Sequence, residues 1–153
     1  EAVTFDADLP TEALTLEIDS TMISQALTNL LKNAGEATEG LIEAGQAPEN
    51  FVPRIQVAMM VDETRATITI ADNGIGLPED RARLFEPYVT TREKGTGLGL
   101  PIVKKIIEEH GGTLELRDAP VMEGCVHSGA MAEIRLPILR NTRGGRNENG
   151  QQV

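Results

Sequence analysis

The stretch from Gln25 to Ala37 reads QALTNLLKNAGEA and belongs to a longer helical pattern. From residue 22 to residue 34, apolar side chains recur every three or four positions, which is the period of one face of an α-helix. Asp19 and Ser20 stand just before this pattern, where N-cap residues are expected. The sequence therefore predicts a long amphipathic helix that begins after Asp19-Ser20 and ends before Gly45.

The polar residues of this helix form a stripe that is predicted to lie opposite the leucines. Such a stripe is usually only a solvated helix face. Two Asn one turn apart with a Lys between them are, however, unfavourable for a helix by propensity. Because an Asn oxygen can bind Mg²⁺ and a Lys ammonium can bind phosphate, the stripe also suits a metal-nucleotide site. Its members are Gln25, Asn29, Lys32, Asn33 and Glu36.

The rest of the chain alternates between strand and helix patterns. Polar and apolar residues alternate in six short segments, as in half-buried strands. A second helix is predicted from Leu100 to His110, with Ile102, Val103, Ile106 and Ile107 pointing inward and Gly111-Gly112 as its stop. A short helical piece is expected around Glu79 to Phe85. We predict an α/β fold, a two-layer sandwich in which a mixed, mostly antiparallel sheet of about five strands packs on about three helices. The strand segments are 3–5, 14–18, 54–61, 67–70, 113–117 and 130–136.

Composition limits the function classes. The 153 residues carry a formal net charge of −10, which argues against a protein that coats nucleic acid, because phosphate backbones bind basic surfaces. The longest purely apolar run, Val57 to Val61, is too short to cross a bilayer. A single cysteine, Cys125, excludes an internal disulfide and fits a reducing compartment. Glu1 comes first, without an initiator Met or a signal segment, so we expect a fragment of a longer protein.

We predict one domain over residues 1–139 and a polar tail over residues 140–153. The tail reads RNTRGGRNENGQQV, with three Arg against one Glu and no hydrophobic period. Such a composition is typical of a disordered segment.

A second candidate segment, Asp72-Asn73-Gly74-Ile75-Gly76, follows a predicted strand directly. Asp and Gly after a strand often mark nothing more than a turn. The glycines could also let the backbone approach a flat ligand, while the Asp72 carboxylate accepts a hydrogen bond from an exocyclic amine such as that of adenine. Both interpretations stay open on these residues alone.

A third segment, KGTGLGL, runs from Lys94 to Leu100 and leads straight into the second helix. Glycines at alternate positions before a helix N-terminus expose backbone amides to phosphate groups. The spacing fits neither the Walker pattern nor the dinucleotide-binding pattern, so another kind of nucleotide site is indicated. Just upstream, Phe85 and Tyr88 are more simply read as aromatic residues that pin this loop to the core than as ligand contacts.

Taken in order, QALTNLLKNAGEA, DNGIG, LFEPY and KGTGLGLPIVKKIIEEHGG resemble the N, G1, F and G2 boxes of sensor histidine kinases. The match covers roughly residues 10–137. The residues of these boxes most resemble those of the nitrogen-regulation sensor kinases. The resemblance implies the Bergerat-type ATP-binding fold of the wider gyrase, chaperone, histidine kinase and mismatch-repair ATPase superfamily. It also implies the catalytic, ATP-binding domain of a protein-histidine kinase, with ATP and Mg²⁺ as cofactors.

By this resemblance Asn33 is the Mg²⁺ ligand, Asn29 and Lys32 assist at the phosphates as catalytic residues, and Asp72 binds the adenine amine. Residues 89–94 would be the ATP lid, with Arg92 and Thr96 as phosphate contacts. The implied nucleotide-binding set is Asn29, Lys32, Asn33, Asp72, Gly74, Ile75, Gly76, Tyr88, Thr90, Thr91, Arg92, Lys94, Gly95, Thr96, Gly97, Leu98 and Gly99.

The function that the resemblance implies is transfer of the γ-phosphoryl group of MgATP to a histidine on a separate dimerisation and histidine-phosphotransfer domain. A response regulator receiver domain is the implied next partner, with no contact to nucleic acid or membrane by this segment and a cytoplasmic location. In the ATP-hydrolysing relatives a Glu stands where this chain has Asn29, so poor hydrolysis is expected. His110 is read as a capping or packing residue and His127 as a surface residue. The alternatives are a gyrase-like or chaperone-like ATPase and a nucleotide-sensing docking module without transfer activity.

Overall fold

The computed structural model describes residues 4–9, 19–86, 99–122, 125 and 127–138. These residues form five strands, two α-helices and one 3-10 helix. The predicted strand at residues 14–18 and the predicted boundary between residues 139 and 140 lie outside the described residues. The elements are β1 (Thr4–Asp8), α1 (Ser20–Glu43), β2 (Arg54–Val61), β3 (Arg65–Asp72), η1 (Arg81–Phe85), α2 (Gly99–Glu109), β4 (Thr113–Asp118) and β5 (Ala130–Pro137).

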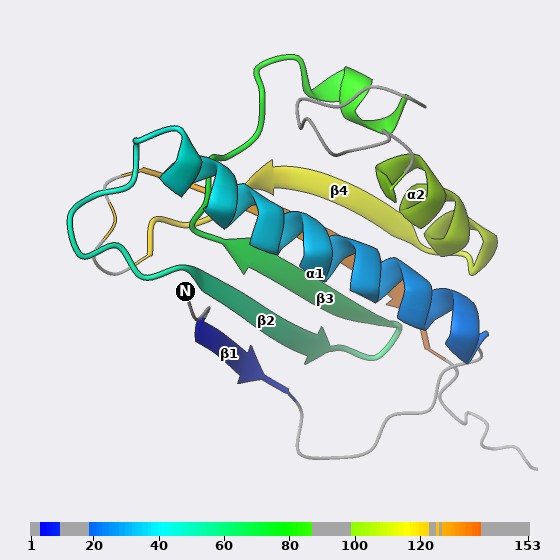
Figure 1. Ribbon diagram of the computed structural model, residues 1–153. Coiled ribbons are helices and arrows are strands. Elements are labelled where there is room, and N and C mark those ends of the chain that lie inside the picture. The colour runs from blue at the N-terminus through cyan, green and yellow to red at the C-terminus, as the bar shows by residue number, and fades with distance from the viewer. Residues whose placement is uncertain (1–3, 10–18, 87–98, 123–124, 126, 139–153) are drawn as a thin grey trace, which may run out of the picture.

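The strands form one sheet in the order β1-β2-β3-β5-β4. β1 pairs with β2 in parallel, and the other three pairs are antiparallel. Both α-helices cover the same face of this sheet (Figure 1). The predicted two-layer sandwich with a mixed, mostly antiparallel sheet is therefore confirmed. No helix in the described part of the chain is both long and apolar enough to cross a lipid bilayer.

The ends of α1 agree with the sequence signals. The Asp19 carboxylate accepts hydrogen bonds from the backbone N–H groups of Thr21 and Met22, both at 3.1 Å, and thereby caps the helix. At the other end Gly45 adopts a positive φ of 72°, and its N–H donates to the Ile42 carbonyl at 3.0 Å. That conformation favours glycine, so the predicted stop before Gly45 is confirmed.

The hydrophobic core lies between the helices and the sheet. One prediction about it is wrong, because Ile102 was expected to point inward and is 37% exposed. At 100° per residue, Ile102 lies roughly 90° from the centre of the buried face of α2. The buried residues of the core are Ile23, Ala26, Leu30 and Ala34 of α1, Val103, Ile106 and Ile107 of α2, and Ile55, Ile70, Leu114, Ala132, Ile134 and Leu136 of the sheet.

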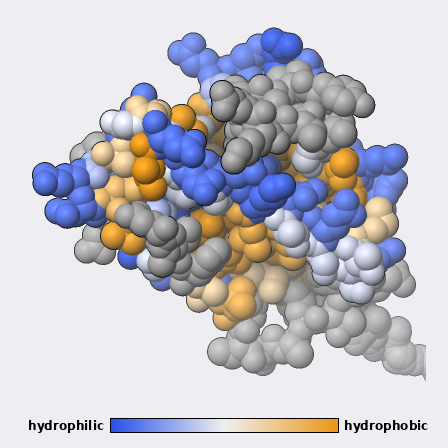
Figure 2. Space-filling view, viewed as in Figure 1, coloured by the Kyte–Doolittle hydropathy of each residue, from blue (hydrophilic) through white to orange (hydrophobic). Residues whose placement is uncertain are grey.

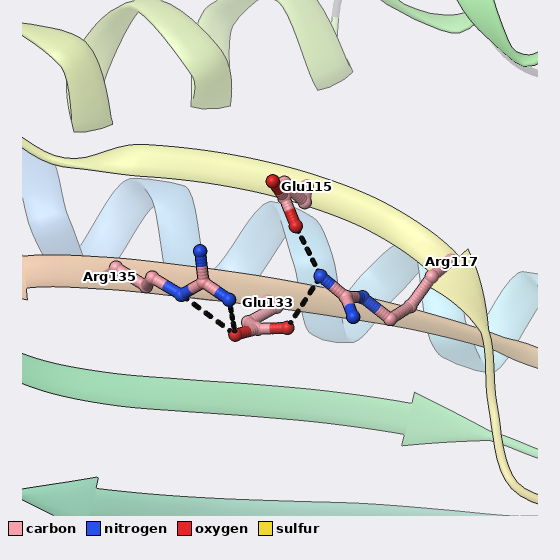
Figure 3. A network of polar contacts seen from close by, with 4 residues as sticks. All are labelled: Glu115, Arg117, Glu133 and Arg135. Carbon is pink, nitrogen blue, oxygen red and sulfur yellow. Dashed lines mark hydrogen bonds and ion pairs between the residues drawn. The ribbon is translucent and has the colours of Figure 1, made fainter.

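The sheet face without helices carries a network of charged side chains on β4 and β5 (Figure 3). Glu115 and Glu133 are direct cross-strand partners, which by itself would be destabilising. Arg117 contacts both carboxylates, and its distance to Glu133 is 3.0 Å. Arg135 holds the other oxygen of Glu133 through two nitrogens, at 2.7 and 2.9 Å. The paired charges thus account for a nearly buried Glu on a face that no helix covers.

Candidate functional site

The predicted Asp72 to Gly76 segment begins at the last residue of β3, on the sheet face covered by the helices. Asp72 is buried, with 4% of its surface exposed. One of its carboxylate oxygens, Oδ1, accepts hydrogen bonds from the backbone N–H of Gly74 at 2.8 Å and from that of Ala130 at 3.3 Å. The carboxylate therefore holds the turn that follows β3 and ties this turn to the first residue of β5.

Gly74 brings this turn into direct contact with α1. A Cβ atom at Gly74 would lie 2.3 Å from the carbonyl carbon of Ala37 and 2.6 Å from the nitrogen of Thr38. The N–H of Ile75 donates to the Ala37 carbonyl at 3.0 Å. The space at Gly74 is filled by the backbone of α1, so glycine is needed here for the packing of the turn on the helix.

The contact at Ala37 brings two of the sequence-predicted regions together. Asn33 lies one helical turn before Ala37, which is a rise of roughly 6 Å along α1, and on nearly the same side of the helix. Ile75, which is 49% exposed, lies against Gly40 one turn further on, at 3.9 Å from the position of a Cβ atom there. Asn33 and the turn from Asp72 to Gly76 therefore border one region of the surface.

The sequence suggested that the polar stripe of α1 lies opposite the buried face. In the structure only part of the stripe does. By the helical angle, Asn33 lies roughly 65° from the centre of the buried face and Lys32 roughly 165° from it. Asn29 and Asn33 are accordingly half-buried, whereas Lys32 is exposed. The outer surface along α1 is mainly hydrophilic in Figure 2. The two Asn side chains thus lie on a flank of the helix, and neither makes a hydrogen bond to another residue that the structure describes.

Asn73 supports the site without facing it, a role that the sequence did not indicate. It is buried, with 4% of its surface exposed. Its side-chain oxygen accepts from the N–H of Arg54 at 2.9 Å, and its amide nitrogen donates to the carbonyl of Val52 at 3.0 Å and to the sulfur of Cys125 at 3.6 Å. Asn73 therefore fixes the end of β3 to the start of β2.

Residues 127–129 approach the same turn from the other side. A Cβ atom at Gly129 would lie 2.1 Å from the carbonyl oxygen of Asp72, so only glycine fits this crossing. His127 is half-buried, and its Nε2 lies 3.0 Å from the carbonyl oxygen of Gly74. His127 therefore reaches the surface only in part, and its ring has a contact within the fold that the sequence did not indicate. The contact is long-range, and nothing in the local sequence pattern around residue 127 signals it.

His110 has the capping role that the sequence predicts. Its Nδ1 lies 2.8 Å from the carbonyl oxygen of Ile106, which can only accept, so Nδ1 carries the proton. Its Nε2 accepts a hydrogen bond from the backbone N–H of Asp19 at 3.0 Å. The ring thus joins the end of α2 to the N-cap of α1, and both of its nitrogens are engaged.

Phe85, the last residue of η1, packs against the core, and the amine of Lys104 lies 5.7 Å from the centre of its ring. The interpretation of Phe85 as a residue that pins this segment to the core is confirmed. Gly99, one of the predicted pocket residues, is the first residue of α2. The predicted lid at residues 89–94 lies outside the described residues, as do Tyr88, Thr90, Thr91, Arg92, Lys94, Gly95, Thr96, Gly97 and Leu98.

An open hollow of about 550 Å³ lies elsewhere, on the sheet face without helices, lined by residues of the β2–β3 turn and by Glu133 and Arg135. Arg65, in its wall, stands at the opposite end of β3 from Asp72, roughly 23 Å away along the strand. Within the described ranges, no group of three or more His, Cys, Asp or Glu side chains could hold a metal ion. The proposed Mg²⁺ ligand, the Asn33 amide oxygen, is of another kind and could act together with the oxygens of a bound phosphate.

Comparison with known proteins assigns this arrangement to a family. The model of the "Histidine kinase-, DNA gyrase B-, and HSP90-like ATPase" family matches residues 18–140. Among solved structures, the catalytic domain of the histidine kinase ThkA superimposes with a TM-score of 0.70 at 30% identity, covering 89% of this chain and 80% of that one. The mycobacterial sensor histidine kinase MprB gives a TM-score of 0.71 at 26% identity, covering 89% and 84%. The chain belongs to the family of histidine kinase-, DNA gyrase B- and HSP90-like ATPases.

Curated relatives narrow this class to the sensor kinases. Nitrogen regulation protein NtrY of Azorhizobium caulinodans is 54% identical over 123 residues, which cover 80% of this chain and 15% of that protein. Sporulation kinase E of Bacillus subtilis is 33% identical over 147 residues, covering 95% and 18%. The predicted resemblance to sensor histidine kinases, nitrogen-regulation kinases among them, is thereby confirmed. The chain spans less than a fifth of the length of these two relatives.

Proposed function

We propose that this chain binds MgATP and transfers the γ-phosphoryl group to a histidine on the dimerisation and histidine-phosphotransfer domain of the same sensor kinase. One observation carries the proposal. The turn from Asp72 to Gly76 is held against α1 at Ala37, one helical turn from Asn33. An adenine-binding carboxylate and a metal-binding amide would thus border one site, in a chain that belongs to an ATPase family.

Different residues of the proposed site would contact the adenine, the phosphates and the metal. Asp72 would accept a hydrogen bond from the adenine amine, and the exposed Ile75 would offer apolar surface to the base. Asn29 and Lys32, further towards the N-terminus of α1, would contact the phosphates. Mg²⁺, held by Asn33 and the phosphate oxygens, would neutralise the charge that develops during transfer. The side chains of Arg92, Lys94 and Thr96 and the glycines of the KGTGLGL segment complete the proposed set of phosphate contacts.

A kinase is favoured over an ATPase by the residue at position 29. Hydrolysis needs a base that activates water, and the amide of Asn29 cannot remove a proton at neutral pH. A histidine acceptor needs no such base, because a neutral imidazole is already nucleophilic. Neither histidine of this chain suits the acceptor role. Both ring nitrogens of His110 are engaged in contacts, and His127 contacts Gly74, in the turn proposed for the base and not for the phosphates. The acceptor therefore belongs to another domain.

The same function would also require a second partner and a location with access to ATP. A response regulator receiver domain would take the phosphoryl group from the histidine, and the site would face the cytoplasm, where ATP is available. Residues 1–139 would act as the ATP-binding domain and residues 140–153 as a tail without a role in the site. The net charge of −10 does not prevent the binding of anionic ATP, because the phosphates would lie near the local positive charge of Lys32 and of the metal.

The proposal predicts transfer without rapid hydrolysis. With γ-labelled ATP and Mg²⁺, this chain should phosphorylate the histidine-bearing dimerisation domain of the same kinase in an acid-labile form, and steady-state release of phosphate by the chain alone should stay low. Fast release of phosphate without transfer would instead support a gyrase-like or chaperone-like ATPase. MgATP binding without movement of phosphate would support a nucleotide-sensing docking module.

A further inference from the structure

The peptide group between Gly74 and Ile75 is held from two sides. Its N–H, on Ile75, donates to the Ala37 carbonyl of α1 at 3.0 Å. Its carbonyl, on Gly74, lies 3.0 Å from Nε2 of His127. In a trans peptide these two groups point in opposite directions, so α1 and residue 127 hold the same peptide plane from opposite sides. Gly74 is buried, so its carbonyl has little access to water as an alternative partner.

The direction of the contact defines the state of the histidine ring. A carbonyl oxygen can only accept, so Nε2 of His127 carries the proton and donates it. The His127 side chain consists of a rigid ring on few rotatable bonds. It therefore fixes the Gly74 carbonyl at a small cost in side-chain entropy. A buried carbonyl without a hydrogen-bond donor raises the free energy of this conformation of the turn. Rotation of the peptide towards another partner would then be favoured.

The chain around His127 is built to approach this turn. Gly129 crosses Asp72 so closely that a Cβ atom would lie 2.1 Å from its carbonyl oxygen and 2.7 Å from its carboxylate. The N–H of Ala130 donates to the same carboxylate at 3.3 Å. Further along, the N–H of Ala119 donates to the Gly129 carbonyl at 2.9 Å and closes the crossing. His127 therefore lies on a segment that is anchored at Asp72. Asp72 itself lies two residues before Gly74, whose carbonyl His127 contacts.

We propose that His127 is a positioning residue for the base-binding end of the nucleotide site. By fixing the Gly74–Ile75 peptide it sets the orientation of the turn in which Asp72 and Ile75 would meet the adenine ring, without touching the nucleotide itself. The inference rests on the proposed function, because it takes the turn from Asp72 to Gly76 as the adenine site. A turn that adopts the competent orientation in only a tenth of the molecules binds about tenfold more weakly.

The test compares variants of this chain by calorimetric titration with ATP and with ADP. His127→Phe keeps a flat ring and removes the donor, and should weaken the binding of both nucleotides by about tenfold. The effect should be equal for ATP and ADP, because both carry the adenine base. His127→Gln can donate from its side-chain amide and should restore affinity to within about threefold of the unaltered chain. Val121→Ala, at an exposed residue of the same β4–β5 connection, is the matched control and should change nothing.

Amide hydrogen exchange at Ile75 gives a readout that does not depend on nucleotide. The exchange should be faster in His127→Phe than in His127→Gln, because the peptide loses one of its two anchors. Equal affinity and equal exchange in the Phe variant and the unaltered chain would overturn the inference, and so would equal losses in the Phe and Gln variants. If the unaltered chain binds no ATP, the proposed function fails, while the exchange rates still test the anchoring. Should His127→Phe fail to fold, His127→Ala takes its place.

Discussion

Substituting Asn33 with alanine is expected to weaken the binding of MgATP by about a hundredfold and to leave the fold intact. Loss of a residue that only supports a metal ligand typically costs ten- to a hundredfold in metal affinity, and loss of the ligand itself should cost at least as much. Asn33 lies half-buried within α1 and makes no hydrogen bond to another described residue. Because alanine is the better helix former, the melting temperature should stay the same or rise.

Metal dependence separates this effect from a general loss of binding. In the presence of a chelator, Asn33→Ala and the unaltered chain should bind ATP with similar, weak affinity, because the missing contact acts through Mg²⁺. Thr28→Ala, at an exposed position on a different side of α1, is the matched control and should keep full Mg²⁺-dependent affinity. Full affinity in Asn33→Ala would show that the metal end of the site lies elsewhere.

The substitution Gly74→Ala is expected to damage both the fold and the site. The added Cβ would lie 2.3 to 2.6 Å from backbone atoms of Ala37 and Thr38, which cannot move without displacing α1. Overpacking of this kind typically costs about 1 to 3 kcal/mol and at times more, and we expect the upper end of this range because the clash is with backbone. If the turn moves away instead, the hydrogen bond from Ile75 to Ala37 is lost, and ATP binding should fall with it.

A glycine within α1, Gly35, supplies the control for that substitution. Nothing lies within 4 Å of the position that a Cβ atom would take at Gly35. Gly35→Ala should therefore stabilise the helix, by up to about 1 kcal/mol, since alanine is favoured over glycine inside helices. Thermal melts and calorimetric titrations of both variants provide the comparison. A Gly74→Ala variant that melts and binds ATP like the unaltered chain would contradict the close packing of this turn on α1.

Local signals explain why much of the fold could be predicted. The cap at Asp19, the glycine at position 45 and the helical period between them fix α1 from residues that are neighbours in sequence. The hairpin of β2 and β3 is likewise encoded by two alternating segments around a polar turn, in which the Asp62 carboxylate accepts hydrogen bonds from the N–H groups of Thr64 and Arg65. These bonds stabilise the charged form and lower the pKa of Asp62.

Contacts between distant segments explain what the sequence could not predict. The approach of His127 to Gly74 joins residues 53 positions apart, and neither helical nor strand periodicity reports on it. The same holds for Asn73, since nothing in its segment indicated that its side chain bonds to the backbone at the start of β2. The exposure of Ile102 depends on where the buried face of α2 is centred, which only packing against the sheet and α1 decides. Motif recognition indicated where the proposed site lies, whereas the contacts around it could be described only from the structure.

Every part of the proposed function depends on MgATP binding between α1 and the end of β3. Chemical-shift mapping of the backbone amides during titration with MgATP tests it most directly. We expect the largest changes around Asn33 and Ala37, along the turn from Asp72 to Gly76 and at His127. Changes confined to the hollow near Met60 and Arg135 on the other face of the sheet, or no changes at saturating MgATP, would contradict it.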